Sequence, residues 1–194
     1  MRISVFGLGY VGVVSSACLA KDGHIVVGVD PNPTKVDLVN SGRSPIVESE
    51  VDELIGEAVQ NGRLTATNDS LSAVENSDIS LVCVGTPSQS NGSLDLTYVR
   101  SVCKEIGAAI SEKTDKHIVV MRSTMLPGTM IDVVLPTLEA ASGKKAGEHF
   151  GVAINPEFLR EGTAVYDYRN PPKTVIGCSD DATADVISDR KSVV

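Results

Sequence analysis

Short apolar runs alternate with longer segments of helical periodicity along the whole chain. The short runs have strand length and lie at residues 2–6, 25–29, 64–67, 79–84, 117–121, 151–154 and 174–177. The segments between them predict helices at residues 11–20, 34–40, 51–60, 70–75, 95–111, 129–141 and 155–161, with a last helix beginning at Asp180. Alternation of strand and helix is typical of parallel sheets, whose strands need helical crossovers. We therefore predict an α/β fold, with a doubly wound, mostly parallel sheet and helices on both faces, over residues 1–194.

Three closely spaced glycines follow the first predicted strand. Gly7, Gly9 and Gly12 form the pattern G-x-G-x-x-G, and Asp30 ends the second strand. In a Rossmann-like site the first glycine allows a tight turn, the second leaves room for a pyrophosphate, and the third lets the helix pack closely. Unpaired amides at the helix start favour the phosphates. We predict that Asp30 accepts hydrogen bonds from the adenosine ribose and repels a 2′-phosphate, so the cofactor is NAD rather than NADP. The alternative is a glycine turn without a ligand.

Hydroxyl groups follow two further strands of the predicted sheet. Thr86 stands in a Gly-Thr-Pro turn after the strand at 79–84, and Thr124 follows the strand at 117–121. Ligands of open parallel sheets lie beyond the carboxyl ends of the strands, which makes these ends candidate contacts with the cofactor. Lys35 lies five residues after Asp30. It is either near the adenosine end of the cofactor or a solvated lysine of a helix.

The composition of the chain limits the kinds of core, binding partner and location that are expected. Hydrophobic residues make up 42% of the chain and aromatic residues 4%, with no Trp, which predicts an aliphatic core. The net charge of −8 and the lack of a basic stripe along the sequence disfavour nucleic acid as a partner. No apolar run approaches the length of a membrane span, and the chain begins directly with a strand, so we expect no membrane insertion and a cytoplasmic location. The four cysteines have no metal-binding spacing, and we expect buried free thiols.

Four separate motifs occur in one order along the chain. They are residues 7–12 (GLGYVG), 84–87 (VGTP), 122–124 (RST) with Pro127-Gly128, and 155–162 (NPEFLREG). Together they resemble the UDP-glucose/GDP-mannose dehydrogenase family over nearly the whole chain. Residues 142–147, and 167–172 ahead of 174–177, are most similar to the branch that acts on GDP-mannose in alginate synthesis. The alternatives are an enzyme of the same family that acts on UDP-glucose, and a non-catalytic NAD-binding module.

The resemblance implies a definite chemistry. The family oxidises the C6 alcohol of a nucleotide sugar to a carboxylate in two steps with two NAD. A cysteine thiolate holds the intermediate as a thiohemiacetal and then as a thioester, which water hydrolyses.

The resemblance also implies roles for individual residues. Tyr10 and Val11 are expected to contact NAD at the glycine turn, and Asp30 and Lys35 its adenosine end. Thr86 and Thr124 are expected beside the cofactor, with Thr124 also holding a catalytic water. At the sugar, Glu161 is expected to contact the substrate and assist hydrolysis of the thioester, and Glu157 is expected to be a second acid behind it. The alternative for Glu157 is a partner of Arg160 or a carboxylate at a helix start.

The chain departs from the family's pattern in three places. Residues 48–50 read Glu-Ser-Glu where the family usually has Glu-Pro-Gly. None of the four cysteines stands in the Gly-Gly-Ser-Cys-Leu-Pro-Lys setting of the family's nucleophile, and residues 189–194 do not resemble the family's continuation. We therefore expect an NAD-binding domain that lacks the connecting helix and the C-terminal substrate domain and is inactive alone. The full-length enzyme is expected to be a homo-oligomer with a small nucleotide sugar as substrate.

Overall fold

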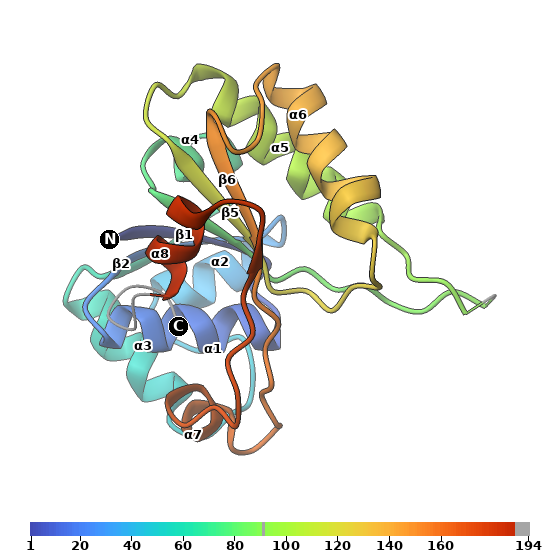
Figure 1. The fold of residues 1–194 in the computed structure, drawn as a ribbon. Coiled ribbons are helices and arrows are strands. Elements are labelled where there is room, and N and C mark those ends of the chain that lie inside the picture. The colour runs from blue at the N-terminus through green and yellow to red at the C-terminus, as the bar shows by residue number, and fades with distance from the viewer. Residues whose placement is uncertain (91, 189–194) are drawn as a thin grey trace.

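A single mixed sheet forms the centre of the molecule (Figure 1). The computed structural model describes residues 1–90 and 92–188, so Asn91 and the tail 189–194 lie outside the described residues. The strand order is β3-β2-β1-β4-β5-β6-β7, and all neighbours are parallel except β6 and β7. The strands are β1 (Arg2–Phe6), β2 (Ile25–Val29), β3 (Leu64–Thr67), β4 (Ile79–Val82), β5 (His117–Met121), β6 (Phe150–Ile154) and β7 (Gly177–Cys178).

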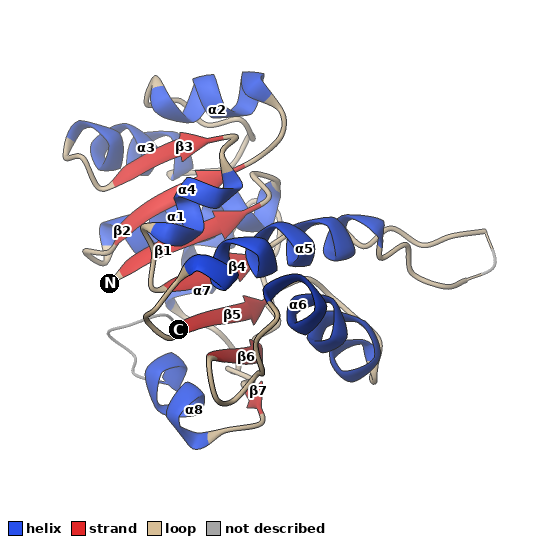
Figure 2. Cartoon of the chain, turned by 90° about the horizontal axis from the view of Figure 1, so that it is seen from above, coloured by secondary structure: helices blue, strands red, loops and turns tan. Residues whose placement is uncertain are grey.

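Helices cover both faces of this sheet, as the sequence predicts (Figure 2). The helical elements are α1 (Tyr10–Lys21), α2 (Pro33–Asn40), α3 (Val51–Gln60), α4 (Ser70–Glu75), α5 (Thr97–Glu112), the π-helical turn η1 (Met130–Val134), α6 (Leu135–Ser142), α7 (Ala164–Arg169) and α8 (Asp181–Ser188). One cluster of buried side chains joins the sheet to α1, α3, α7 and α8, and the other joins it to α4, α5 and α6. Because both faces are covered, β4 and β5 are buried along their whole length, which explains their apolar sequences.

Helix α1 is buried nearly all round, from Gly12 to Ala20. Its small residues allow it to lie close to the sheet while α3 packs against its outer side. This burial fixes the position of the first turn of α1 relative to the ends of the strands.

Polar side chains form a chain of hydrogen bonds inside the sheet. The Ser4 hydroxyl contacts the hydroxyls of Ser77 at 2.9 Å and Ser80 at 2.7 Å, and Ser80 contacts Nε2 of His117 at 2.8 Å. His117 is fully buried, and burial, followed by the charge of Lys113, lowers the pKa of its imidazole to about 3. His117 is therefore a neutral core residue.

The structure corrects three of the predicted elements. Residues 155–161 do not form a helix but a loop, and α7 begins only at Ala164. The expected strand at 174–177 is reduced to β7, which pairs antiparallel with β6. The helix predicted at 129–141 is divided into η1 and α6, at a point where Pro136, in the first turn of α6, lacks the amide of a regular helical hydrogen bond.

Two smaller expectations also change. Helix α5 has Leu96 as its N-cap, although Asp95 still accepts a hydrogen bond from the Thr97 amide at 2.9 Å. All four cysteines are free, but only Cys18 and Cys103 are buried, whereas Cys83 is half-buried and Cys178 exposed. Within residues 1–90 and 92–188, we find no helix with the length and apolar character to cross a bilayer.

The strand order reverses direction between β1 and β4. The chain proceeds outward from β1 to β2 and β3, and then returns to the other side of β1 with β4. In open parallel sheets the crevice at the carboxyl ends of such a pair of strands is the usual ligand site.

Candidate functional site

A cleft of about 720 Å³ opens at this switch point. Its floor is the end of three strands, with Gly7 after β1, Asp30 after β2, and the segment 83–85 after β4. The volume lies in the range of small-molecule and cofactor sites. Of the residues predicted from the sequence, the cleft brings together Gly7, Gly9, Asp30 and Lys35.

The glycine turn presents free backbone amides to a ligand. Gly9 is the N-cap of α1 and makes no side-chain cap, and the first turn of α1 contains no acidic residue. The amides of Tyr10, Val11 and Gly12 therefore stand at the positive end of a buried helix. A Cβ built on Gly9 would meet no protein atom within 4 Å, so the lack of a side chain here leaves a space that the protein itself does not fill. In Rossmann-type sites the corresponding glycine leaves room for the pyrophosphate of a dinucleotide.

Gly12 has a different, purely internal reason to be glycine. A Cβ at this position would lie 1.8 Å from the carbonyl oxygen of Gly7. The turn and the helix can thus be this close only because residue 12 has no side chain.

Asp30 is buried beneath the glycine turn, with 5% of its surface exposed. Its Oδ2 accepts from the Leu8 amide at 2.7 Å and from Nζ of Lys35 at 3.2 Å, and its Oδ1 accepts from the Asn32 amide at 2.9 Å. A carboxylate offers about four lone-pair sites, so Oδ1 retains capacity for a ligand hydroxyl. Lys35 is half-buried, pairs with Asp30 and lines the same cleft.

One wall of the cleft was missed by the sequence analysis. It consists of four residues on one side of α5: Tyr98, Ser101, Val102 and Glu105. Their spacing of three and four residues is that of a single helix face, so the helical period contained the signal. Glu105 accepts hydrogen bonds from Ser70 at 2.5 Å and from Ser101 at 3.3 Å.

Thr86 and Thr124 lie together, beyond the ends of β4 and β5. The Thr86 hydroxyl donates to the carbonyl oxygen of Thr124 at 2.7 Å. The adjacent Ser123 hydroxyl donates to the carbonyl of Val84 at 2.6 Å, which joins the two strand ends. The Thr124 side chain is exposed, and its hydroxyl is available to a ligand at this edge of the sheet.

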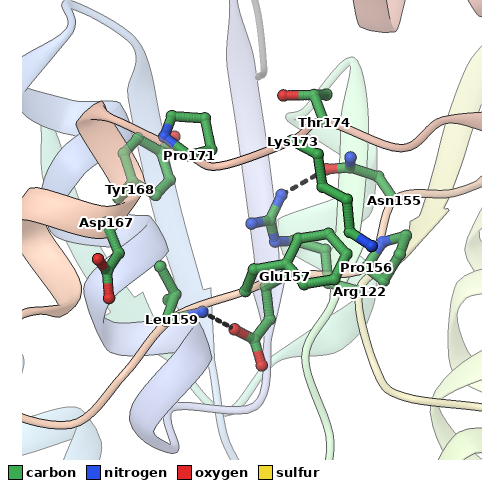
Figure 3. Close-up of a pocket in the computed structure, with 11 residues that line it drawn as sticks. Arg122, Asn155, Pro156, Glu157, Leu159, Asp167, Tyr168, Pro171, Lys173 and Thr174 are labelled. Carbon is green, nitrogen blue, oxygen red and sulfur yellow. Dashed lines mark hydrogen bonds between the residues drawn. The ribbon is translucent and has the colours of Figure 1, made fainter.

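Glu157 lines a second, much smaller cavity of about 40 Å³ enclosed by the segment 155–174, which includes α7 (Figure 3). The buried guanidinium of Arg122 enters this cavity and donates to Oδ1 of Asn155 at 2.5 Å. The Glu157 carboxylate turns away from Arg122 and accepts from the Leu159 amide at 2.6 Å (Figure 3). Both alternatives considered for Glu157 are therefore wrong, because no helix begins there and Arg160 pairs with Asp167 at 2.7 Å.

Glu161 is exposed, and its neighbours are tied to the first residue of α1. The Tyr10 hydroxyl donates to Oε2 of Glu48 at 2.5 Å and lies 3.2 Å from the carbonyl oxygen of Arg160. Glu48 also accepts from the amide of Gly162 at 2.7 Å. In the sequence, Glu48 stands out only as part of an atypical loop. No local pattern connects it with Gly162 and Ala164, which lie more than a hundred positions away.

The fold and the cleft define a class of protein. A glycine turn at the switch point, a buried helix start and an acid after β2 are the features of a Rossmann-type dinucleotide-binding domain. The family model described as "UDP-glucose/GDP-mannose dehydrogenase family, NAD binding domain" matches residues 1–190, and the chain belongs to this family.

Known relatives agree with this assignment. GDP-mannose 6-dehydrogenase of Pseudomonas aeruginosa is 57% identical over 189 residues, which cover 97% of this chain and 43% of that protein. UDP-glucose 6-dehydrogenase AglM of Haloferax volcanii is 40% identical over 97% of this chain and 44% of its own length. The crystal structure of a ternary complex of GDP-mannose dehydrogenase from P. aeruginosa superposes with a TM-score of 0.95 at 57% identity, covering 96% of this chain and 43% of that one. The chain thus spans less than half the length of these relatives.

Proposed function

We propose that this chain is the NAD-binding part of an enzyme that oxidises C6 of GDP-mannose to give GDP-mannuronate. The identity of 57% to a GDP-mannose 6-dehydrogenase, against 40% to a UDP-glucose 6-dehydrogenase, supports GDP-mannose as the sugar nucleotide. In this proposal residues 1–194 form one domain, and a connecting helix and a substrate domain belong to the remainder of the enzyme. The second candidate substrate is UDP-glucose, in view of the AglM relative.

The observation that carries the proposal is the space at Gly9 beside Asp30. The space adjoins the amides of the first turn of α1, and Asp30 lines the same cleft. In the proposed complex the pyrophosphate lies against Gly7, Gly9, Tyr10, Val11 and Gly12. Bound NAD would supply the acceptor for a hydride from the sugar carbon.

At the adenosine end, Asp30 accepts from a ribose hydroxyl with the free capacity of Oδ1. Lys35 holds the carboxylate in place through its contact with Oδ2. The same carboxylate disfavours NADP, because a 2′-phosphate would approach it with like charge.

At the other end, Thr86 and Thr124 lie beside the cofactor, and the Thr124 hydroxyl orients a water molecule. Glu161 contacts the sugar and exchanges a proton with this water, while Glu157 is a second acid behind it. The contact between Thr86 and Thr124 supports their common role, since it places both at the edge of the sheet that continues the cleft.

Calorimetric titration of the 194-residue chain with NAD tests the cofactor site. Saturable binding with one site is expected, and NADP should bind at least tenfold more weakly. A flat titration up to millimolar NAD, with a folded chain by circular dichroism, would contradict the proposal.

The substrate requires the product of the complete gene. With NAD in excess, we expect two NADH per GDP-mannose and a kcat/KM for GDP-mannose at least tenfold above that for UDP-glucose. The reverse preference would establish the second candidate, and binding of NAD without oxidation of either sugar would indicate a non-catalytic NAD-binding module.

The proposal also covers the location, the product and the oligomeric state of the complete enzyme. We place the enzyme in the cytoplasm, where free thiols such as the exposed Cys178 stay reduced. We assign its product to an alginate-type polysaccharide, and we expect the complete enzyme to be a homo-oligomer. Cell fractionation, loss of uronate polymer in a deletion strain and light scattering test these statements.

A further inference from the structure

Glu48 lies on the loop between α2 and α3, yet its carboxylate contacts three distant groups. Oε2 accepts from the Tyr10 hydroxyl at 2.5 Å and from the Gly162 amide at 2.7 Å, and Oε1 accepts from the Ala164 amide at 3.2 Å. These partners belong to the start of α1 and to the segment 160–164 that leads into α7. One carboxylate thus joins three parts of the chain that are far apart in sequence.

The contacts surround Glu161 on both sides. The peptide group after it donates the Gly162 amide to Glu48 at 2.7 Å. The Arg160 carbonyl of the peptide group before it lies 3.2 Å from the Tyr10 hydroxyl, whose single proton goes mainly to Glu48 at 2.5 Å, so this second contact is the weaker one. The backbone of Glu161 is therefore held chiefly through Glu48, while its own side chain stays exposed. Tyr10 is also the first residue of α1, directly after Gly9 of the cofactor cleft.

Charge strengthens this arrangement. A hydrogen bond to an ionised carboxylate is about twice as strong as one between neutral groups. The Tyr10 hydroxyl and the backbone amides lower the pKa of Glu48, so it is ionised at neutral pH. Burial and the contact with Glu48 raise the pKa of Tyr10, so its hydroxyl keeps the proton that it donates.

A second carboxylate fixes the far side of the segment. Asp167 of α7 accepts from the Arg160 amide at 3.0 Å and from the Arg160 guanidinium at 2.7 Å. The pKa of Asp167 is lowered to about 2, chiefly by Arg160. Asp167 holds the segment to α7, whereas Glu48 connects it directly to Tyr10, the first residue of α1.

We propose that Glu48 is a positioning residue for the oxidation, which holds the backbone of Glu161 at a fixed place relative to the first turn of α1. The inference rests on the proposed function, in which Glu161 contacts the sugar and α1 binds the pyrophosphate. Glu48 itself touches neither ligand. Its effect is to keep the Glu161 carboxylate at a constant distance from the cofactor.

Hydrogen exchange of the 194-residue chain tests the contact without any ligand. In Glu48→Ala, the amides of Gly162 and Ala164 should exchange at least tenfold faster. Glu48→Gln should restore part of the protection, because its side chain keeps one acceptor oxygen. The matched control is Glu50→Gln on the same loop; this carboxylate lies 3.8 Å from Arg169 and should leave both amides unchanged. Unaltered exchange in Glu48→Ala would overturn the inference.

Steady-state kinetics of the complete gene product test whether the Glu48 contact matters for oxidation of the sugar nucleotide. Glu48→Gln should lower kcat for the sugar nucleotide at least tenfold and change the KM for NAD less than threefold, because the Asp30 end is untouched. Glu50→Gln should retain the kcat of the unsubstituted enzyme. If the unsubstituted enzyme turns over and Glu48→Gln keeps its kcat, the positioning role is wrong. If the unsubstituted protein neither binds NAD nor oxidises a sugar, the proposed function fails, and the exchange experiment still decides whether Glu48 holds this segment.

Discussion

In the proposed complex, Asp30 and Lys35 together set the preference between coenzymes. The ammonium of Lys35 lies 3.2 Å from Oδ2 of Asp30, with the carboxylate 7% and the lysine 35% exposed in their side chains. The carboxylate thus pairs with a cation that would otherwise attract a 2′-phosphate. We expect discrimination against NADP to depend on this repulsive element as much as on the contact with the ribose.

Asp30→Asn should therefore change the preference between coenzymes. The amide keeps an acceptor for the Leu8 N–H, but it loses the charge and frees Lys35. A hydrogen bond to a charged group contributes about 1.5–3 kcal/mol, so the Kd for NAD should rise about 10–100-fold while the Kd for NADP falls. Asp30→Ala should change the two Kd values in the same directions. It should also lower the stability of the fold, because the Leu8 amide loses its acceptor. Calorimetry with both coenzymes measures this, with Asp37→Asn on the exposed side of α2 as the control; an unchanged NAD/NADP ratio would refute the ribose assignment.

Two glycines of the same turn should respond differently to one methyl group. Gly9→Ala should fold with nearly the stability of the parent chain, because no protein atom lies within 4 Å of the new Cβ, but it should lose NAD binding. Gly12→Ala places its Cβ 1.8 Å from the Gly7 carbonyl and should lower the free energy of unfolding by at least about 3 kcal/mol. Urea unfolding and NAD titration of both variants separate the two effects. Equal stability of the two variants would show that the tight turn is not what requires Gly12.

At the scale of elements, the parallel strands carry an unusual polar line through the core. Ser4 of β1, Ser80 of β4 and His117 of β5 are fully buried and hydrogen-bonded in series. The charged groups that bear on His117 are Lys113 after α5 and Asp78 before β4, and burial is the largest influence. Since the imidazole is neutral in the folded chain and titrates near pH 6.5 when unfolded, acid favours the unfolded state.

The stability of the fold should accordingly fall as the pH drops below about 6.5. The folded pKa of about 3 means that this contribution is complete above pH 6.5 and is lost progressively down to about pH 3. Between pH 6.5 and 5 the free energy of unfolding should fall by about 1.5–2 kcal/mol from this group. Urea unfolding of the parent chain and of His117→Gln at both values gives the measurement. The variant, which cannot be protonated, should lack this part of the slope; identical slopes would mean that the pKa of His117 is the same in the folded and unfolded chains.

Most elements could be predicted from the sequence because their signals are local. The apolar runs of β1 to β6 and the caps and periodicity of α2, α3 and α5 give their positions within a few residues. The loop 155–163 could not be predicted, since its conformation depends on Tyr10 and Glu48 rather than on its own propensity. The strand expected at 174–177 is shortened for a similar reason. Nδ2 of Asn155 donates a hydrogen bond to the Val175 carbonyl, which would otherwise accept from a neighbouring strand.

At the scale of the whole molecule, the cofactor cleft is assembled from segments distant in sequence. Its wall includes the ends of β1, β2 and β4 and one side of α5, which span residues 6–105. The sequence predicted the glycine turn and Asp30 as parts of one site, and in the structure Gly7, Gly9 and Asp30 line the same cleft. The α5 wall and the contacts of Glu48 could not be predicted, because only the tertiary structure brings them beside partners that are distant in sequence.

A ligand that touches all these segments should stabilise the fold as a unit. At a concentration of 100 times its Kd, NAD should add about 2.7 kcal/mol to the free energy of unfolding. For a chain of this size the melting temperature should then rise by about 5–10 °C. Differential scanning calorimetry with NAD, and with Gly9→Ala as the control, measures the shift. A shift of equal size in Gly9→Ala would place the binding elsewhere.

Tyr10 connects two parts of the molecule, since its amide belongs to the glycine turn and its hydroxyl contacts Glu48 beside the segment of Glu161. Under the proposed function, any coupling between coenzyme and sugar through this contact is reciprocal: bound NAD favours the sugar by the same free energy by which bound sugar favours NAD. The affinity of each ligand then reports on the other, whichever of them binds first.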